Sequence, residues 1–251
     1  MMGIEINNLA YSYEQKIVLE DLTCCFNAGQ IHIILGINGA GKSTLVKLLN
    51  RFLKPRSGSI LLAGKGLSDL TLNQIAKSIG YVAQQHQPCE LTVTDYILLG
   101  RKPHLKWNFG INDEKIVFAV MEKLNLGDLA LRPLAHLSGG ELQKTIIARA
   151  LVQKPDVLLL DDPTSNLDLK NQIEVMDIIQ QETDEHILTT VITMHDINLA
   201  LRYASSFTLL KDNRILDFGG MEVITPDNLS ALFGIRVKLH RIDGYVTVMP
   251  E

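Results

Sequence analysis

Long apolar runs, a surplus of basic charge and paired cysteines are all missing from this sequence. No run approaches the roughly 18 apolar residues that a helix needs to span a bilayer, and we expect no secretory signal at the start. The net charge of −4 gives no reason to expect a nucleic-acid partner, since such proteins normally carry a basic face. Cys24, Cys25 and Cys89 show no metal-ligand spacing. We interpret Cys24 and Cys25 as small buried side chains and predict a reducing compartment, the cytoplasm.

The chain does have enough apolar sequence for a substantial core. It has 251 residues, of which 46% are hydrophobic, a length that suits one large α/β domain. Alternation from Ile4 to Phe26 predicts antiparallel strands. The segment from Leu91 to about Leu126 indicates helices, interrupted at Gly100–His104, with Asn112 capping the second one.

A glycine-rich stretch from Gly36 to Thr44 fits the pattern G-x-x-x-x-G-K-[ST]. It follows the apolar run Ile31–Leu35, typical of a strand buried on both faces, and it precedes leucines at helical spacing. The glycines would turn backbone N–H groups toward an anion at a helix N-terminus. Lys42 would then reach the β- and γ-phosphates of a nucleotide, and the Ser43 hydroxyl would bind Mg²⁺. The alternative, a turn that only connects two elements, gives Lys42 and Ser43 no folding purpose.

Two adjacent acids follow a second buried strand. Asp161 and Asp162 end the run Val157–Leu160, and ligands of open α/β sheets bind at the carboxyl ends of such strands. Asp161 can hold Mg²⁺ through water, and Asp162 can face an attacking water molecule. Plain turn residues are the alternative interpretation.

Two further polar residues come just past strands that we expect at the same edge of the sheet. His195 follows Thr190–Thr193, and Gln84 follows Tyr81-Val82-Ala83. His195 could be structural, and Gln84, which begins the polar cluster continuing through Gln85–Pro88, could belong to an ordinary loop. Their shared position favours a role beside the phosphate loop.

The run Leu137-Ser138-Gly139-Gly140-Glu141 precedes a helical pattern. Ser138 and Glu141 form a capping box, which is a sufficient structural explanation for those two residues. The two glycines, however, lower helix propensity by roughly 1 kcal/mol each. They make better sense if something approaches the backbone closely, as at a second anion site. A single nucleotide rarely needs two such sites on one subunit, so a symmetric partner is indicated.

These motifs together resemble a known family. Their order along the chain is Gly36–Thr44, Gln84, Leu137–Glu141, Leu158–Asp162, Ser165–Asp168 and His195. This order resembles the nucleotide-binding subunit of an ABC transporter over nearly the whole chain. The resemblance implies an α/β P-loop NTPase core with a mainly parallel sheet, an N-terminal antiparallel β subdomain, and ATP and Mg²⁺ as ligands. It implies a single ABC ATPase domain over 1–251, with a helical subdomain at about 85–155 and a C-terminal β-hairpin at about 235–249.

The resemblance also implies a role for each motif residue. The nucleotide-binding residues would be Tyr13, Gly36, Asn38, Gly39, Ala40, Gly41, Lys42, Ser43 and Thr44. Tyr13 would stack on adenine, although from its spacing alone it is equally an ordinary strand aromatic. The catalytic residues would be Asp162, His195 and Gln84, and the metal ligands Ser43, Gln84 and Asp161. Ser138, Gly139, Gly140 and Glu141 would contact the ATP of a second copy of the chain, and Asp168 would communicate across the homodimer.

Two positions depart from the family pattern. Ile37 stands where the family usually has Pro, which matters little because the loop backbone binds the phosphates. Asp162 stands where the family usually has Glu, the residue that polarises the attacking water. Aspartate is shorter by roughly 1.5 Å, and a misplacement of about 1 Å can cost on the order of a hundredfold in rate. We therefore predict slow hydrolysis.

A finer resemblance concerns the transported substance. Leu98–His104, Thr225-Pro226-Asp227 and Leu232-Phe233-Gly234 resemble the importers of iron–siderophores, haem and cobalamin. This implies permease partners that dock on the segment from Gln85 to about Gly110, an indirect link to a substrate-binding protein, and a place on the cytoplasmic face of the membrane. The alternatives are an exporter and a soluble ABC-type ATPase in assembly or regulation.

Overall fold

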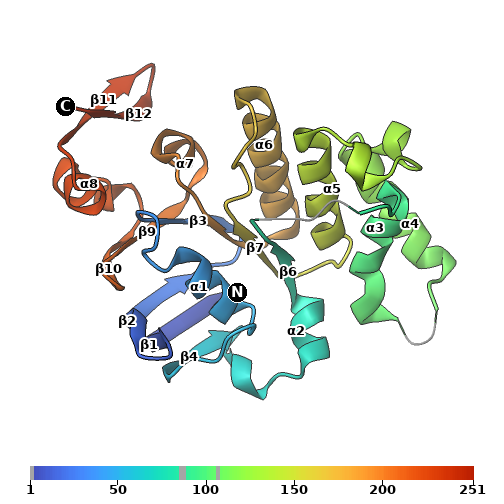
Figure 1. The fold of residues 1–251 in the computed structure, drawn as a ribbon, viewed down its shortest axis with the longest axis horizontal. Coiled ribbons are helices and arrows are strands. Elements are labelled where there is room, and N and C mark those ends of the chain that lie inside the picture. Colours follow the sequence, from blue (N-terminus) through green and yellow to red (C-terminus); the bar gives the residue numbers. More distant parts are fainter. Residues whose placement is uncertain (1–2, 85–88, 106–107) are drawn as a thin grey trace.

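A computed structural model describes residues 3–84, 89–105 and 108–251, which form two sheets and a terminal hairpin surrounded by helices (Figure 1). The strands are β1 Ile4–Tyr13, β2 Lys16–Phe26, β3 Gln30–Leu35, β4 Ser57–Leu62, β5 Lys65–Gly66, β6 Ile79–Val82, β7 Val157–Asp161, β8 Thr189–Thr193, β9 Ser206–Lys211, β10 Arg214–Gly219, β11 Val237–Ile242 and β12 Tyr245–Pro250. The α-helices are α1 Lys42–Leu49, α2 Leu72–Ser78, α3 Val93–Leu98, α4 Ile111–Lys123, α5 Gly139–Leu151, α6 Leu169–His186, α7 Ile197–Tyr203 and α8 Pro226–Phe233. Short 3₁₀ helices are η1 Leu67–Asp69, η2 Leu99–His104, η3 Gly127–Leu129, η4 Leu134–His136 and η5 Met221–Val223.

The central sheet has the strand order β10-β9-β3-β8-β7-β6. Its neighbours pair in parallel except for β9 and β10, which form an antiparallel hairpin at one edge. Every residue of β7 and β8 is buried, as expected of strands covered on both faces. The mainly parallel α/β sheet expected from the sequence is confirmed. Strands β3, β7 and β8 run in the same direction, so the loops that follow them open at one edge of the sheet.

Two buried cores flank this sheet, because alternate residues of each strand face opposite sides. On one side, α1 lies between the central sheet and the antiparallel sheet β2-β1-β4-β5 (Figure 1), with Leu45, Ile34 and Ile6 in a shared core. On the other side α6 and α7 pack on the sheet, with Met176 and Ile33 in the second core. The first core fixes the phosphate loop between β3 and α1.

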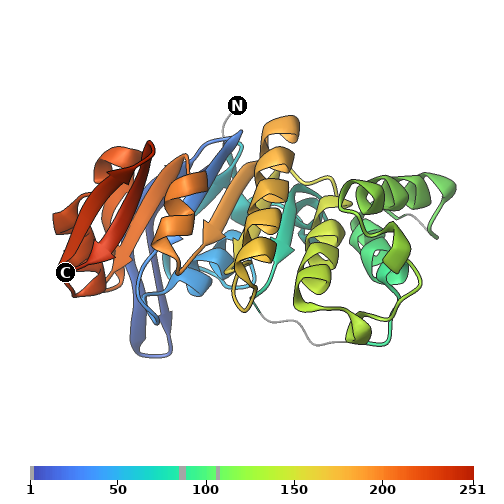
Figure 2. The same cartoon turned by 90° about the horizontal axis from the view of Figure 1, so that it is seen from above.

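The helices α3, α4 and α5 lie at one end of the molecule, and the β11–β12 hairpin lies at the other (Figures 1 and 2). Ile97 of α3, Ile147 of α5 and Leu158 of β7 belong to the same buried core. The helical segment is thus packed continuously onto the sheet. Its division into a subdomain at about 85–155 stays a prediction.

The sequence-based cap of α4 was wrong. Helix α4 begins at Ile111, one residue before Asn112, and the Asp113 carboxylate accepts a hydrogen bond from the backbone N–H of Gly110 at 3.1 Å. Asp113 can do this because a carboxylate at the third helical position reaches back to the free N–H before the helix.

One smaller expectation also needs correction. Cys24 is buried as expected but Cys25 is exposed, because adjacent residues of a strand point to opposite faces. The interruption expected at Gly100–His104 is present, since α3 ends at Leu98, these residues form most of the 3₁₀ helix η2, and α4 begins only at Ile111. A Cβ on Gly100 would lie 2.1 Å from the carbonyl oxygen of Arg149, so the glycine allows η2 to lie against the end of α5.

Among the described residues no helix combines the length and the apolar character that crossing a bilayer requires. The polar cluster Gln85–Pro88 singled out in the sequence lies outside the described residues. The same holds for part of the 85–110 segment predicted to receive the permease.

Candidate functional site

The phosphate loop has glycine where the backbone needs it. Gly41 has φ +102°, a left-handed conformation that side chains rarely adopt, and its added Cβ would lie 2.7 Å from Leu19 Cδ2. A Cβ on Gly36 would lie 2.5 Å from the carbonyl oxygen of Leu210, at the point where the chain leaves β3. These two glycines allow the chain to turn sharply from β3 into α1.

Lys42 lies folded over this loop. Its Nζ donates hydrogen bonds to the carbonyl oxygens of Gly36 at 2.7 Å and Ile37 at 3.2 Å. Burial lowers the pKa of the Lys42 ammonium, while the nearby carboxylates of Asp162 and Asp161 oppose that shift. The end of the Lys42 side chain is therefore held against the loop, close to the two acids.

Asp161 ends β7 beside the first turn of α1. The Ser43 hydroxyl donates to Asp161 Oδ1 at 2.9 Å, and the Thr193 hydroxyl donates to the same oxygen at 2.7 Å. Thr193 also accepts a hydrogen bond from the backbone N–H of Asp162 at 2.9 Å. The sequence reasoning did not single out Thr193, although its place as the last residue of β8 was a usable signal.

Asp162 adopts a left-handed backbone conformation with φ 51° just after β7. Its Oδ2 lies 3.5 Å from Gln84 Nε2 and 3.5 Å from His195 Nε2. Burial raises the pKa of the Asp162 carboxyl and Asp161 adds to this, whereas His195, Lys42 and the Gln84 hydrogen bond oppose it. The structure thus brings together residues from three separate strand ends.

These residues surround one cavity of about 250 Å³ at the carboxyl edge of the central sheet. Its lining consists of Val18, Asn38, Gly39, Gly41, Lys42, Ser43, Thr44, Gln84, Asp161, Asp162, Thr193 and His195. The cavity combines a lysine, a hydroxyl and two carboxylates beside a helix N-terminus, a set suited to a phosphate chain and a hard cation. Val18 was not anticipated, and nothing in the sequence distinguishes it from other strand valines.

Tyr13 is not part of this lining. It is the last residue of β1 and its ring packs edge-on against Tyr11 with 4.9 Å between the centroids. Its side chain is exposed near the turn of the β1–β2 hairpin. An adenine-stacking role for Tyr13 stays a prediction.

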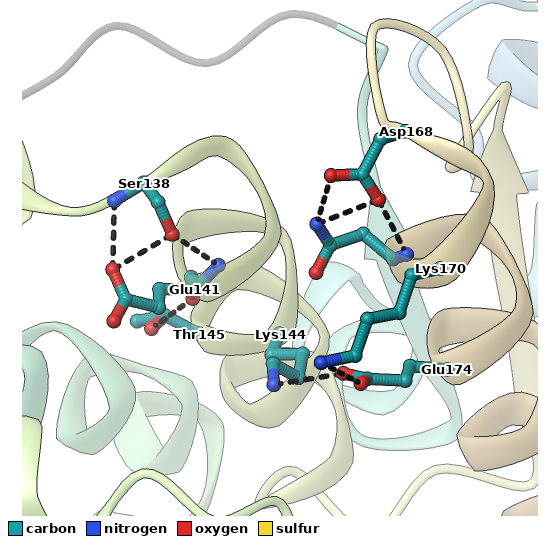
Figure 3. Close-up of polar contacts among 8 residues, drawn as sticks. Ser138, Glu141, Lys144, Thr145, Asp168, Lys170 and Glu174 are labelled. Atoms are coloured by element: carbon teal, nitrogen blue, oxygen red, sulfur yellow. Dashed lines mark hydrogen bonds and ion pairs between the residues drawn. The ribbon is translucent and has the colours of Figure 1, made fainter.

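Ser138–Glu141 lies at the start of α5 (Figure 3). None of these residues lines the cavity. The backbone N–H and the hydroxyl of Ser138 both donate to Glu141 Oε2 at 2.8 Å, and Glu141 N–H donates back to the Ser138 hydroxyl at 3.4 Å. These hydrogen bonds from Ser138 lower the pKa of the Glu141 carboxyl. The capping box is therefore formed, and Ser138 and Gly139 remain exposed.

Asp168 occupies the corresponding position at the start of α6. Its carboxylate accepts a hydrogen bond from the backbone N–H of Asn171 at 2.8 Å, and its side chain is exposed. Figure 3 shows Asp168 and Ser138 at neighbouring helix starts. Within one chain, neither residue belongs to the cavity that holds Lys42.

The fold and the cavity define a class of protein: an α/β nucleotide-binding protein whose phosphate loop joins a central strand to a helix. A family model for ABC transporters matches residues 19–165. The chain belongs to the ABC transporter family, as an ATP-binding subunit. Subunits of this kind hydrolyse ATP to drive transport.

Several relatives match along nearly their full lengths. An ABC transporter ATP-binding protein of Methanocaldococcus jannaschii is 45% identical over 250 residues, which cover 100% of this chain and 98% of that protein. The petrobactin import ATP-binding protein FpuC of Bacillus anthracis is 35% identical, in an alignment that covers 94% of this chain and 88% of FpuC. The iron(3+)-hydroxamate import ATP-binding protein FhuC of Bacillus subtilis is 33% identical, in an alignment that covers 95% of this chain and 90% of FhuC.

Solved structures show the same fold. An inward-facing ABC transporter ascribed to the metal-chelate type superposes with a TM-score of 0.88 at 30% identity, covering 100% of this chain and 98% of that one. A dimeric bacterial ABC transporter cassette superposes with a TM-score of 0.76 at 27% identity, covering 87% of this chain and 98% of that one.

Proposed function

We propose that this chain is the ATP-hydrolysing subunit of an importer for an iron chelate, haem or cobalamin, working as a homodimer on the cytoplasmic face of the membrane. The observation that carries the proposal is the single cavity in which Lys42, Asp161, Asp162 and His195 meet. The import substrate class is supported by relatives named for petrobactin and iron(3+)-hydroxamate import.

The phosphates of ATP would occupy the phosphate loop. The N-terminus of α1, which begins at Lys42 after Gly41, favours negative charge there. Lys42 Nζ, which bonds two loop carbonyl oxygens, would exchange these acceptors for β- and γ-phosphate oxygens. This exchange keeps the ammonium group hydrogen-bonded in both states.

The residues fit a bound Mg²⁺. The Ser43 hydroxyl and the Asp161 carboxylate lie 2.9 Å apart in the cavity, and both are the oxygen ligands that this cation prefers. Gln84 reaches the same cavity with its side-chain amide. When bound, Mg²⁺ would neutralise the charge that develops on the phosphates.

Asp162 would orient the attacking water, with His195 and Gln84 beside it. His195 Nε2 and Gln84 Nε2 each lie 3.5 Å from Asp162 Oδ2, so both can direct the carboxylate. The exposed imidazole of His195, which lines the same cavity, would also contact the γ-phosphate. The acidic and basic groups for hydrolysis thus lie within one subunit.

Completion of the site would require a second copy of the chain. Ser138, Gly139 and Asp168 are exposed and stand outside the cavity of their own subunit. In a head-to-tail pair, the start of α5 in one copy would cover the phosphates held by the other. A related cassette crystallised as a dimer supports this arrangement.

A groove of about 390 Å³, lined mainly by the residues after α1, by α2, by β6 and by η2, is a candidate seat for the permease. Phe52 and Leu72, which line it, are 61% and 73% exposed and give the groove two apolar side chains that a partner could cover. Arg51, Lys102 and Arg149 add positive charge to the same walls. An apolar helix end with acidic flanks would suit this groove.

The test combines ATP binding, assembly and partner capture. Wild-type protein should bind ATP and form a dimer with ATP present, and Lys42→Ala should lose both. Purified from the membrane fraction of its source cells, the chain should remain bound to a multi-span membrane protein, whereas an assembly or regulatory ATPase would not. Retention of ATP binding and dimer closure by Lys42→Ala would contradict the proposal, and so would a wild-type protein that stays monomeric with ATP and its permease.

A further inference from the structure

Asp168 and Asn171 are tied together by three hydrogen bonds at the start of α6. Asp168 Oδ1 accepts from the Asn171 backbone N–H at 2.8 Å, and both carboxylate oxygens accept from Asn171 Nδ2 at 3.0 Å. The first bond is an ordinary helix cap. The other two fix the amide, because a carboxylate only accepts and the NH₂ group must face it. The amide oxygen of Asn171 is therefore held facing away from Asp168.

That oxygen lies against Gly140 in the first turn of α5. A Cβ added to Gly140 would be 2.1 Å from Asn171 Oδ1 and 2.5 Å from its Cγ. The backbone of Gly140 is helical, and an alanine there would favour the helix by roughly 1 kcal/mol. The approach of Asn171 is thus a reason within this chain for glycine at position 140. Gly139 differs, since its added Cβ would meet its nearest neighbour, Leu167, only at 3.7 Å.

A second contact joins the same two helices one turn further along. Lys144 Nζ of α5 lies 3.3 Å from Glu174 Oε2 of α6, and Lys170 Nζ lies 3.7 Å from the other oxygen of Glu174 (Figure 3). The starts of α5 and α6 are therefore held to each other at two levels, by close packing at Gly140 and by charge at Lys144.

We propose that Asn171 is a positioning residue that keeps Ser138 at the start of α5 in register with Asp168 at the start of α6. The inference rests on the proposed function, in which both residues act across the homodimer. A second copy of the chain that displaces Asp168 would also displace the Asn171 amide, because the two are hydrogen-bonded. The amide in turn contacts Gly140 in the first turn of α5. One chain's contact at Asp168 is thereby linked to the contact that its own Ser138 makes with the partner's ATP.

The test is a double-mutant cycle on Gly140→Ala and Asn171→Ala, read by dimerisation with a non-hydrolysable ATP analogue. Gly140→Ala should weaken dimer association about tenfold, because the methyl group displaces the Asn171 amide. Adding Asn171→Ala should restore most of that loss, since the clashing amide is gone. Asn171→Ala alone should weaken the dimer by about threefold and lower the Hill coefficient of ATP hydrolysis. Binding of ATP to the monomer should stay within twofold of wild type in all three variants.

Gln180→Ala is the matched control, because its side chain is exposed on the same helix, α6, and takes no part in the contacts described between α5 and α6. It should leave dimerisation unchanged. A double variant no better than Gly140→Ala would show that Gly140 serves the nucleotide rather than Asn171, and the inference would fail. An unchanged dimer and Hill coefficient in Asn171→Ala would also overturn it, independently of how Gly140→Ala folds. Failure of the wild-type protein to dimerise would instead contradict the proposed function.

Discussion

The hydroxyl of Thr193 donates a 2.7 Å hydrogen bond to Asp161 Oδ1 and accepts a 2.9 Å hydrogen bond from the backbone N–H of Asp162. One buried hydroxyl at the end of β8 therefore connects the two acids at the end of β7. The same Asp161 oxygen accepts from Ser43, so Thr193 fixes the carboxylate that would hold Mg²⁺.

Replacing Thr193 with valine keeps the side-chain shape but removes this hydroxyl. We expect Thr193→Val to lower the free energy of unfolding by about 1–3 kcal/mol, because the buried Asp161 oxygen loses a donor. It should also raise the Mg²⁺ concentration needed for half-maximal ATP hydrolysis. Thr193→Ser retains the hydroxyl and should restore the Mg²⁺ dependence. Denaturant unfolding checks the first expectation and a Mg²⁺ titration of ATP hydrolysis checks the second. If Thr193→Val reached half-maximal hydrolysis at the same Mg²⁺ concentration as wild type, the second expectation would be contradicted.

The short side chain of Asp162 gives a second prediction. Both Gln84 and His195 stand 3.5 Å from its Oδ2, at the outer limit of a hydrogen bond. An additional methylene in Asp162→Glu should bring the carboxylate closer to the γ-phosphate and raise the steady-state ATPase rate, by up to about a hundredfold. Asp162→Asn, of equal size but without charge, should abolish hydrolysis while ATP still binds. No gain in rate with glutamate would show that the site already accommodates aspartate.

Arg101 gives a prediction about stability rather than catalysis. Its guanidinium is buried, donates to Asp113 Oδ1 at 2.9 Å and donates to the carbonyl oxygen of Val152 at 2.7 Å. Arg101→Met should lower the free energy of unfolding by roughly 1.5–3 kcal/mol, since hydrogen bonds from a charged group are lost. Arg101→Lys should recover only part, because an ammonium cannot reproduce both contacts of the planar guanidinium. Thermal unfolding of the two variants measures this. If Arg101→Lys were as stable as wild type, the planar shape of the guanidinium would not matter at this position.

His32 makes the stability depend on pH. It is buried in β3, where Nε2 lies 3.0 Å from the carbonyl oxygen of Asn27 and Nδ1 contacts the Ser206 hydroxyl. Burial lowers the pKa of His32 below its ordinary value of 6.5, although the Asn27 hydrogen bond opposes this. The unfolded chain therefore binds the proton more readily than the folded one, so this contribution to stability is present above pH 6.5 and is lost as the pH falls through the folded pKa. His32→Gln should flatten that part of the profile of unfolding free energy against pH, and an unchanged slope would assign the effect to other groups.

The elements that the sequence predicted well are those whose signal lies within a few neighbouring residues. The phosphate loop between β3 and α1 and the capping box at Ser138 depend on local backbone chemistry, so their positions follow from spacing alone. The sheet edge that gathers Asp161 and His195 follows from parallel strands ending on one side. For α4, by contrast, the sequence indicated Asn112 as the cap, whereas the helix begins at Ile111 after Gly110, so Asn112 lies inside the first turn.

Contacts between distant residues could not be obtained in this way. The link from Thr193 to Asp161 and the contact of Asn171 with Gly140 depend on how strands and helices pack, which no spacing encodes. The sequence indicated that the glycines in the first turn of α5 imply a close approach. In the structure, Asn171 of the same chain approaches Gly140, whereas a Cβ added to Gly139 would meet Leu167 only at 3.7 Å. Contact of either glycine with a partner's nucleotide stays a prediction.

The capping box at Ser138 has a consequence for the lone subunit in the cell. With the Glu141 carboxylate already seated on the Ser138 N–H and hydroxyl, the helix start presents its own negative group until a partner's phosphates compete for it. A lone subunit would therefore have to give up these hydrogen bonds when it closes on a partner, and this cost, present at both Ser138 helix starts of a pair, would help to keep copies without nucleotide apart.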